Sequence, residues 1–484
     1  MDKTKNLILD VEENPKKVKD WLLLALQHIL AMLVACITVP LLTGLPVAAT
    51  LISAGIGTIC YILITKKKSP VFLSSSFAYL SPMASALAIG LVGQATGNNY
   101  LALIIGMIFV GLVYLAIALV IRFIGTGWLN KLLPPVIVGP VIMVIGLSLA
   151  SSAVSNITSA TGSGQSYNLI ALLCGLIALF ATAFASHYGN KTISLIPFII
   201  GMGSGYMAAL LFTLIGFYGF GNEYFHIIDF SPLVDIFAAD KISFASFFNY
   251  KLFVPNSSES FIFLRTDEIS KFDWTTIGEV ALLFIPVAFV TVCEHIGDHE
   301  NLGNIIGRDL LNGEPGMKRT LTGDGLATAV SGALCGAANT TYGENVAVVG
   351  MTKIASVNVV LLAAILTIIF GFFTPLTALL QTIPFCVTGG VSLILYGFIA
   401  SSGVKMLIKE RIDFGISKNI FIASTILVAG IGGLAFKFGD PSNPTITITS
   451  IAVAMILGIV MNIVLRDKKD TPKEDIKSEN ASSK

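Results

Sequence analysis

Three carboxylates lie within or at the start of long apolar stretches of the sequence. Glu294 follows about eighteen mostly apolar residues, Asp298 comes one helical turn later on the same face, and Glu344 begins another apolar segment. A charged side chain at the centre of a membrane span costs about 2.5–3.5 kcal/mol. Each of these carboxylates is therefore either functional or part of an ordinary loop end or structural ion pair. We expect Glu294 and Glu344 to be functional, whereas Asp298 lies nearer the end of its helix and is as well explained by contact with water.

Two buried glutamates can hydrogen-bond a ligand and carry a proton. A carboxylate accepts hydrogen bonds when ionised and gains a donor when protonated. A planar heterocycle with N–H beside C=O would pair with such groups, and the aromatic rings of Phe77 and Tyr342 would stack on it. Protonation of one glutamate would then couple proton uptake to substrate binding. A simple cation pathway fits the same residues, so both alternatives stay open at this point.

The composition predicts that most of the chain lies in a lipid bilayer. Hydrophobic residues make up 54% of the 484 residues and charged residues only 12%, against roughly 25% charged in a soluble domain. The net charge of +1 provides no field that would attract nucleic acid. The six cysteines are scattered through apolar stretches without metal-ligand spacing, so we expect neither disulfides nor a metal site.

About fourteen apolar segments, each near the length of a membrane span, can be counted between residues 21 and 465. Seven precede and seven follow the polar stretch 218–275, whose many aromatic residues predict a folded outer cap. Lysine and arginine gather in alternate short loops, such as 66–68 and 405–411. Positive charge favours the cytoplasmic side, so both termini are predicted to be cytoplasmic.

Two successive sets of seven segments must cross the membrane in opposite senses, which is the inverted-repeat plan of many secondary transporters. The third segment of each set, segments 3 and 10 of the chain, opens with small polar residues at 74–76 and 339–341. Such residues favour extended backbone over helix. Backbone leaves the helix at membrane depth only where protein or water satisfies it, so these two broken segments predict the binding site. The alternative is a pair of ordinary loop ends with Ser and Thr caps.

At this level of detail the sequence resembles the nucleobase–ascorbate transporter family, also called nucleobase:cation symporter-2, and most closely its bacterial members that carry uracil. The resemblance runs from about Trp21 to Leu465. It rests on SSSFAYLSP at 74–82, CEHIGD at 293–298, NTTYGENVAVVGMTK at 339–353 and GGVSLILYGFIASSG at 389–403.

The resemblance implies an all-α polytopic membrane protein with fourteen segments in a 7+7 inverted repeat. Segments 1–4 and 8–11 would form a core domain, and segments 5–7 and 12–14 a gate domain. The expected divisions are a cytoplasmic segment 1–20, core 21–125, gate 133–217, outer loop 218–275, core 276–374, gate 378–465 and a cytoplasmic tail 466–484. The gate domain would also form a homodimer contact.

The activity implied by the resemblance is uptake of uracil with protons through the plasma or inner membrane, with the core moving against the gate. The proton is the coupling ion, and no cofactor, metal or enzyme activity is expected. Carried over position by position, the substrate should contact Phe77, Glu294, Tyr342, Gly343, Glu344 and Tyr396. Proton coupling should involve Glu294 and Asp298. The residues expected beside the site, without direct substrate contact, are Gln27, His28, Ser76 and Asn345.

Two positions depart from the family pattern, and several functions compete. Ala347 stands where the signature has glycine, and Asp298 stands where a relative has histidine. A xanthine or urate permease of the same family is the nearest alternative, since pocket size is not readable from sequence. An anion transporter of the same fold is disfavoured because two acidic residues would repel its substrate. A membrane enzyme or ion channel fits the predicted repeat less well.

Overall fold

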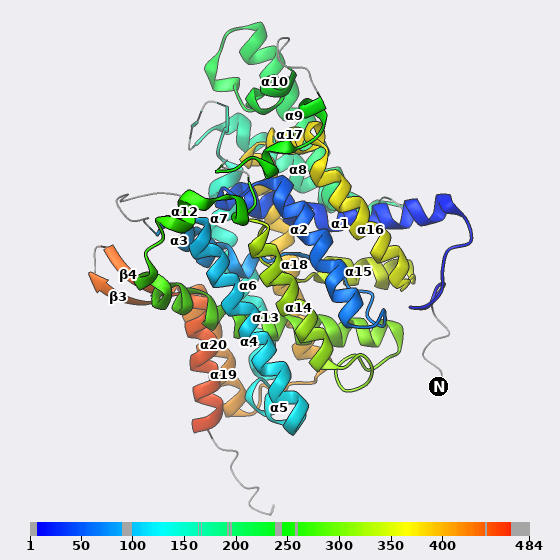
Figure 1. The fold of residues 1–484 in the computed structure, drawn as a ribbon, viewed down its shortest axis with the longest axis vertical. Coiled ribbons are helices and arrows are strands. Elements are labelled where there is room, and N and C mark those ends of the chain that lie inside the picture. The colour runs from blue at the N-terminus through cyan, green and yellow to red at the C-terminus, as the bar shows by residue number, and fades with distance from the viewer. Residues whose placement is uncertain are drawn as a thin grey trace, which may run out of the picture.

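The computed structural model describes residues 7–89, 99–162, 164, 165, 167–190, 193, 196–237, 244–256, 260–440 and 443–465. Helices dominate these residues (Figure 1). The predicted cytoplasmic tail, 466–484, lies outside them.

Eight helical stretches of the described chain are long and apolar enough to cross a membrane. They contain α1 (Val18–Thr43), α2 (Val47–Ile64), α4 (Tyr100–Ile124), α6 (Pro135–Ser148) with α7 (Ala150–Ile157), α8 (Leu169–Tyr188), α9 (Pro197–Phe212), α13 (Ile277–Ile306) and α18 (Phe385–Lys409). Shorter apolar helices include α3 (Leu80–Ala88), α16 (Val357–Phe372), α19 (Ser417–Ile431) and α20 (Ser450–Val464). The chain is therefore an integral, multi-pass membrane protein, while the count of fourteen spans stays a prediction.

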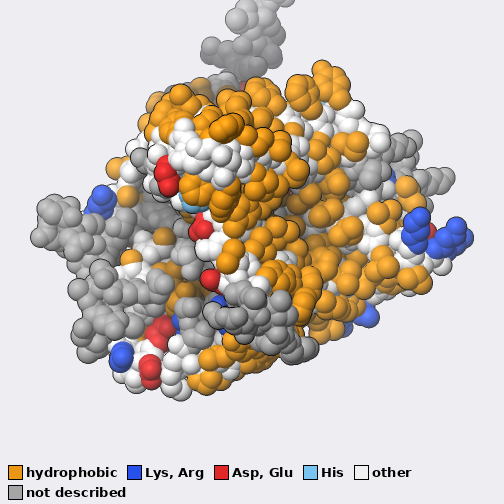
Figure 2. All heavy atoms as spheres, turned by 90° about the horizontal axis from the view of Figure 1, so that it is seen from above, with side chains coloured by type: hydrophobic (Ala, Val, Ile, Leu, Met, Phe, Trp, Pro, Cys, Tyr) orange, Lys and Arg blue, Asp and Glu red, His pale blue; other side chains and the backbone are white. Residues whose placement is uncertain are grey.

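The outer surface of these helices suits a lipid environment. Hydrophobic side chains cover much of the face shown in Figure 2, and charged side chains occupy only a few places on it. Large apolar residues of the helices, such as Leu112, Phe123 and Val428, are exposed. A soluble protein rarely exposes such continuous apolar area, so these side chains are expected to face lipid.

The helices pack in two groups. In the first group α4 packs on α13 and α14 (Met317–Ala333), α2 packs on α14 and α16, and α1 packs on α16 and α15 (Gly343–Thr352). In the second group α18 packs on α6, α7 and α8, while α8 packs on α9 and α19 packs on α20. Helix α13 also touches α6 and α20 of the second group. Whether the groups move as separate core and gate domains stays a prediction.

The predicted breaks in segments 3 and 10 are present as two short strands. Strand β1 (Leu73–Ser75) pairs antiparallel with β2 (Asn339–Thr341), so Leu73 lies opposite Thr341 and Ser75 opposite Asn339. All six residues are buried. The Asn339 side chain donates to the carbonyl of Ser53 at 3.0 Å. The backbone groups that leave the helix are thus paired inside the first helix group, as a break at membrane depth requires.

Each strand leads directly into a helix. Strand β1 is followed by the 3₁₀ turn η2 (Phe77–Tyr79) and α3, and β2 is followed by α15. The first N–H groups of a helix have no partner inside it and carry partial positive charge. Because the two strands are antiparallel, the two helices leave from opposite ends of the strand pair.

The expectation of an all-α chain is wrong for residues 436–448. Strand β3 (Phe436–Asp440) and strand β4 (Asn443–Ile448) pair there as an antiparallel hairpin, visible at the edge of Figure 1. The sequence NPTITI alternates β-branched residues, which favour a pleated surface over a helix. Helix α20 consequently begins at Ser450, after the hairpin.

The stretch 218–275, predicted to be the outer cap, is folded over much of its described length. It contains the short helices α10 (Ser231–Phe237), α11 (Phe244–Phe247) and α12 (Thr266–Ser270), with α10 at one end of the molecule in Figure 1. The Arg265 guanidinium lies 3.8 Å from the centre of the Tyr100 ring. The Glu268 carboxylate accepts from the backbone N–H of Leu101 at 2.8 Å, and burial raises the pKa of this carboxyl group. These contacts attach the cap to the start of α4.

The N-terminal strap, which we define as residues 7–14, crosses the first helix group. The carbonyl of Leu9 accepts from the backbone N–H of Ala355 at 2.9 Å, just beyond the end of α15. The Arg308 guanidinium, just beyond the end of α13, lies 2.7 Å from the carboxylate of Asp10. One short segment thus contacts the ends of both helices that carry the predicted glutamates.

Candidate functional site

A cavity of about 290 Å³ lies between the two helix groups. The crossing strands, α13 and α15 line one side, and α6 and α18 line the other. The predicted residues that line it are Ser76, Phe77, Glu294, Asp298, Tyr342, Gly343 and Glu344. The structure therefore brings together five of the six predicted substrate contacts and both predicted proton-coupling residues, although their roles stay predictions.

Helix α13 presents Glu294 and Asp298 to the cavity from one face, because they are four residues apart. Both side chains are partly buried. Glu294 Oε2 and Asp298 Oδ2 are buried atoms with no hydrogen-bond partner among the described residues. An unpaired buried acceptor costs on the order of 1–3 kcal/mol, so these oxygens are well placed to bind a ligand donor or a proton.

The start of α15 completes the polar side of the cavity. Gly343 is the first residue of this helix, and a Cβ atom at this position would lie 3.2 Å from Asp298 Oδ1. A side chain here would press on the carboxylate, so glycine leaves room for it. Glu344 follows in the first turn, where unpaired N–H groups also face the helix start. Carboxylate acceptors and backbone donors thus stand next to each other.

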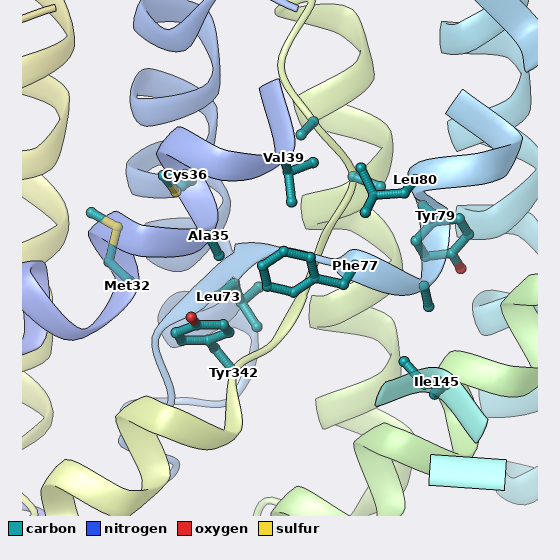
Figure 3. Packing of buried hydrophobic residues seen from close by; sticks show 14 of the residues in the cluster. Met32, Ala35, Cys36, Val39, Leu73, Phe77, Tyr79, Leu80, Ile145 and Tyr342 are labelled. Carbon is teal, nitrogen blue, oxygen red and sulfur yellow. The ribbon is translucent and has the colours of Figure 1, made fainter. Parts of the chain in front are cut away.

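Aromatic rings form the apolar side of the cavity. The Phe77 ring meets the Tyr396 ring edge-on, with 5.3 Å between centroids and 80° between planes. In Figure 3 the rings of Phe77 and Tyr342 lie near each other and near Leu73. Tyr396 itself does not line the cavity but lies behind Phe77, where it is 3% exposed. A direct contact between Tyr396 and a ligand is therefore expected only if Phe77 moves.

Three of the residues predicted beside the site are buried near it without lining the cavity. His28 and Gln27 lie on α1, which packs on α15, and Asn345 lies on α15 next to Glu344. The polar side-chain atoms of Asn345 and the ring of His28 are buried, and these two side chains interact with each other. Ser76, the fourth, does line the cavity.

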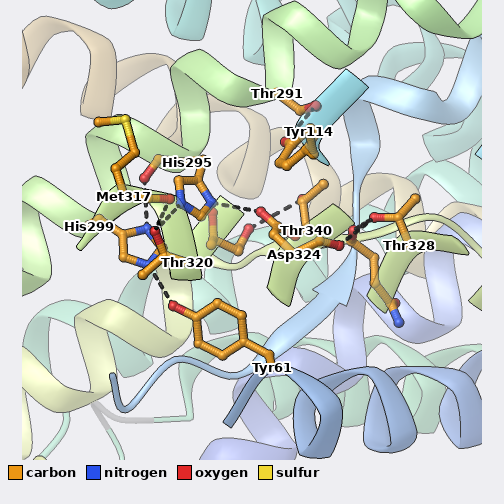
Figure 4. A network of polar contacts seen from close by, with 12 residues as sticks. Tyr61, Tyr114, Thr291, His295, His299, Met317, Thr320, Asp324, Thr328 and Thr340 are labelled. Carbon is orange, nitrogen blue, oxygen red and sulfur yellow. Dashed lines mark hydrogen bonds and ion pairs between the residues drawn. The ribbon is translucent and has the colours of Figure 1, made fainter. Parts of the chain in front are cut away.

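The sequence analysis missed a fourth carboxylate within the apolar segments. Asp324 of α14 is fully buried, and its Oδ2 lies 2.7 Å from His295 Nδ1. The other ring nitrogen of His295 lies 3.0 Å from the Thr320 hydroxyl. Figure 4 shows this network. Asp324 could have been noticed in the sequence, because it is a lone charge within a segment predicted to span the membrane.

The buried network continues along α13 toward its C-terminal end. His299 Nδ1 lies 2.8 Å from the carbonyl of His295, and His299 Nε2 lies 2.6 Å from the Tyr61 hydroxyl. That hydroxyl also lies 2.9 Å from the Ser69 hydroxyl. Helix α13 therefore has two polar faces: one carries the carboxylates of the cavity, and the other is fixed to α2 and α14 by fully paired histidines.

The cavity offers carboxylate acceptors and aromatic rings to a small polar molecule. Within the part of the chain that the structure describes, no group of three His, Cys, Asp or Glu residues could hold a metal ion. Ala347 lines the cavity, so its methyl group, which replaces the glycine of the family signature, faces the space where a ligand would bind.

Comparisons with known proteins agree with this description. The chain is 40% identical over 458 residues to the uracil permease of Bacillus caldolyticus, covering 95% of this chain and 94% of that one. It is 32% identical over 443 residues to the uracil permease of Escherichia coli K12, covering 92% and 90%.

Solved structures of the same fold are more distant in sequence. The transmembrane domain of a cyanobacterial bicarbonate transporter, BicA, matches with a TM-score of 0.56 at 12% identity, covering 93% of this chain and 99% of that one. The murine anion transporter Slc26a9 matches with a TM-score of 0.60 at 10% identity, covering 93% and 69%.

The family model Xan_ur_permease, described as "Permease family", matches residues 19–439. The chain belongs to this permease family, the nucleobase–ascorbate transporters.

Proposed function

We propose that the chain is a uracil permease that takes up its substrate together with protons through a cell membrane. The observation that carries the proposal is the cavity in which Glu294 and Glu344 stand beside Phe77 and Tyr342. A uracil ring offers N–H donors next to C=O acceptors in one plane. The carboxylates would accept from the ring N–H groups, the backbone at Gly343 would donate to a ring carbonyl, and the aromatic side chains would cover the ring face.

Proton coupling follows from the crowding of carboxyl groups. Glu294, Asp298 and Glu344 share one cavity, and three negative charges at such short range repel one another strongly. Protonation of one of them removes part of this repulsion and adds a donor for the ligand. We assign this proton to Glu294, with Asp298 as its neighbour on the route.

Transport would proceed by alternating access, with the first helix group as the core and the second as the gate. The cavity lies between the two groups, which is where transporters of this kind bind substrate. We expect a homodimer held through the gate, both termini in the cytoplasm, and no cofactor. The relatives named uracil permeases favour uracil over xanthine or urate. The acidic cavity disfavours the anions named for the two structural neighbours.

The test is uptake of labelled uracil in cells that lack their own uracil permease. Uptake should rise as the outside is made more acidic and fall when the proton gradient is dissipated. Unlabelled uracil should compete and xanthine should not. Uptake that is blocked by xanthine but not by unlabelled uracil would refute the substrate assignment. In proteoliposomes, uracil should drive proton uptake, and uracil accumulation without proton movement would refute the coupling.

A further inference from the structure

The cavity is closed differently at its two ends along α18. The lining residues of this helix run from Phe398 to Lys409. Just before them lies Tyr396, which is sealed against Phe77 with both rings nearly buried. At the other end the side chain of Lys409 is 39% exposed. One end is therefore shut by a buried aromatic contact, and the other is reached by solvent.

An ion pair bridges the second end of the cavity. Lys409 Nζ lies 2.6 Å from Glu300 Oε1, and both residues line the cavity. Glu300 lies six residues after Glu294 on α13, about 9 Å further along the helix axis. The pair therefore joins α13 of the first helix group to the end of α18 of the second, on the route between the glutamates and solvent.

Charged residues next to Glu300 and Lys409 compete for the same partners and weaken the ion pair between them. Lys405 lies one helical turn before Lys409 and also lines the cavity. Glu410, the next residue after α18, has a pKa raised by burial and by the Glu300 carboxylate beside it. A partly exposed ion pair with competing neighbours contributes little to stability. The ion pair can therefore form and separate in every transport cycle. The Phe77–Tyr396 contact at the other end is buried, so water cannot take the place of either ring.

We propose that Glu300 and Lys409 form an ionic latch that closes the cavity toward the side on which α13 and α18 end. The latch holds the two helix groups together at this end and must separate before a ligand can leave there. The inference rests on the proposed movement of the two groups. In the predicted orientation this side is the cytoplasm, so the latch controls release of substrate into the cell.

The experiment measures how fast the cavity opens, without substrate or a proton gradient. A cysteine placed by Ser76→Cys reports on opening of the cavity, because Ser76 lines it and is buried while the ion pair is formed. Five of the six natural cysteines are buried, and Cys60→Ser removes the half-buried one. Labelling by a membrane-impermeant maleimide is followed in inside-out vesicles. Glu300→Gln and Lys409→Gln should each speed the labelling about 1.5- to 5-fold, the range expected from a weak ion pair.

The charge swap separates the ion pair from effects of the single residues. The double variant Glu300→Lys with Lys409→Glu should label at nearly the original rate. Glu314→Gln is the matched control, because its partner Lys68 belongs to the same helix group and the pair does not cross the cavity. Unchanged labelling in both single variants, or a charge swap as fast as the single variants, would overturn the latch. If labelling responds but no uracil is taken up, the proposed substrate fails and the latch stands.

Discussion

Replacement of Glu344 by glutamine tests the central contact of the proposed site. Glu344→Gln keeps the size of the side chain in the first turn of α15 but replaces one acceptor oxygen by an N–H donor. The new donor would face a ring N–H of uracil. The variant loses a hydrogen bond to a charged group, which contributes about 1.5–3 kcal/mol. We therefore expect the dissociation constant for uracil to rise about 10- to 150-fold.

The measurement is calorimetric titration of the purified protein with uracil. Glu279→Gln is the matched control, because Glu279 lies in the first turn of the same helix as Glu294, 15 residues and about 22 Å before it. The control should bind uracil as the original chain does. Thermal unfolding of both variants checks that they are folded. An unchanged dissociation constant in a folded Glu344→Gln protein would refute the role given to this carboxylate.

Four further changes have defined outcomes. Glu294→Gln should bind uracil but fail to accumulate it against a gradient, and retained accumulation would contradict the proton assignment. Asp324→Ala leaves a buried nitrogen of its histidine partner without a hydrogen-bond partner; thermal unfolding should show a loss of about 1–3 kcal/mol, and an unchanged melting temperature would count against the pair. Gly146→Val places a Cβ atom 2.4 Å from a backbone oxygen of α18, whereas Gly203 has nothing within 4 Å. We expect the first to lose about 1–3 kcal/mol of stability and Gly203→Val to lose less, and equal losses would argue against close packing of α6 and α18. Arg308→Ala removes the ion pair to the N-terminal strap; limited proteolysis should cut the strap faster, and an unchanged cutting rate would mean that the backbone pairing alone holds it.

The position of the cavity could be predicted from the sequence, because the residues that indicate it stand out within short stretches of the chain. Glu294 stands out as a charge after a long apolar run, and residues 74–76 and 339–341 stand out as polar residues where helix was expected. Each signal needs only the residue types of one short stretch. The structure places both strands and both glutamates around the same cavity.

The features that were missed depend on distant elements. Nothing near Asp324 in the sequence identifies His295 as its partner, since 29 residues and a turn between helices separate them. The ion pair of Glu300 with Lys409 spans 109 residues. Such pairings follow from how helices are rotated against each other, which apolar patterns do not specify to within one side chain. The hairpin at 436–448 was missed for a different reason: its alternating pattern is short and continuous with an apolar helix.

The N-terminal strap sets a time order on the assembly of the protein. Leu9 pairs with Ala355, which is made 346 residues later. At about 5–20 residues per second, the ribosome adds Ala355 on the order of 20–70 s after Leu9. The contacts of Leu9 and Asp10 therefore cannot help the first helices to insert. They form only after α13 and α15 are in place, so the beginning of the chain is among the last parts of the first helix group to find its position.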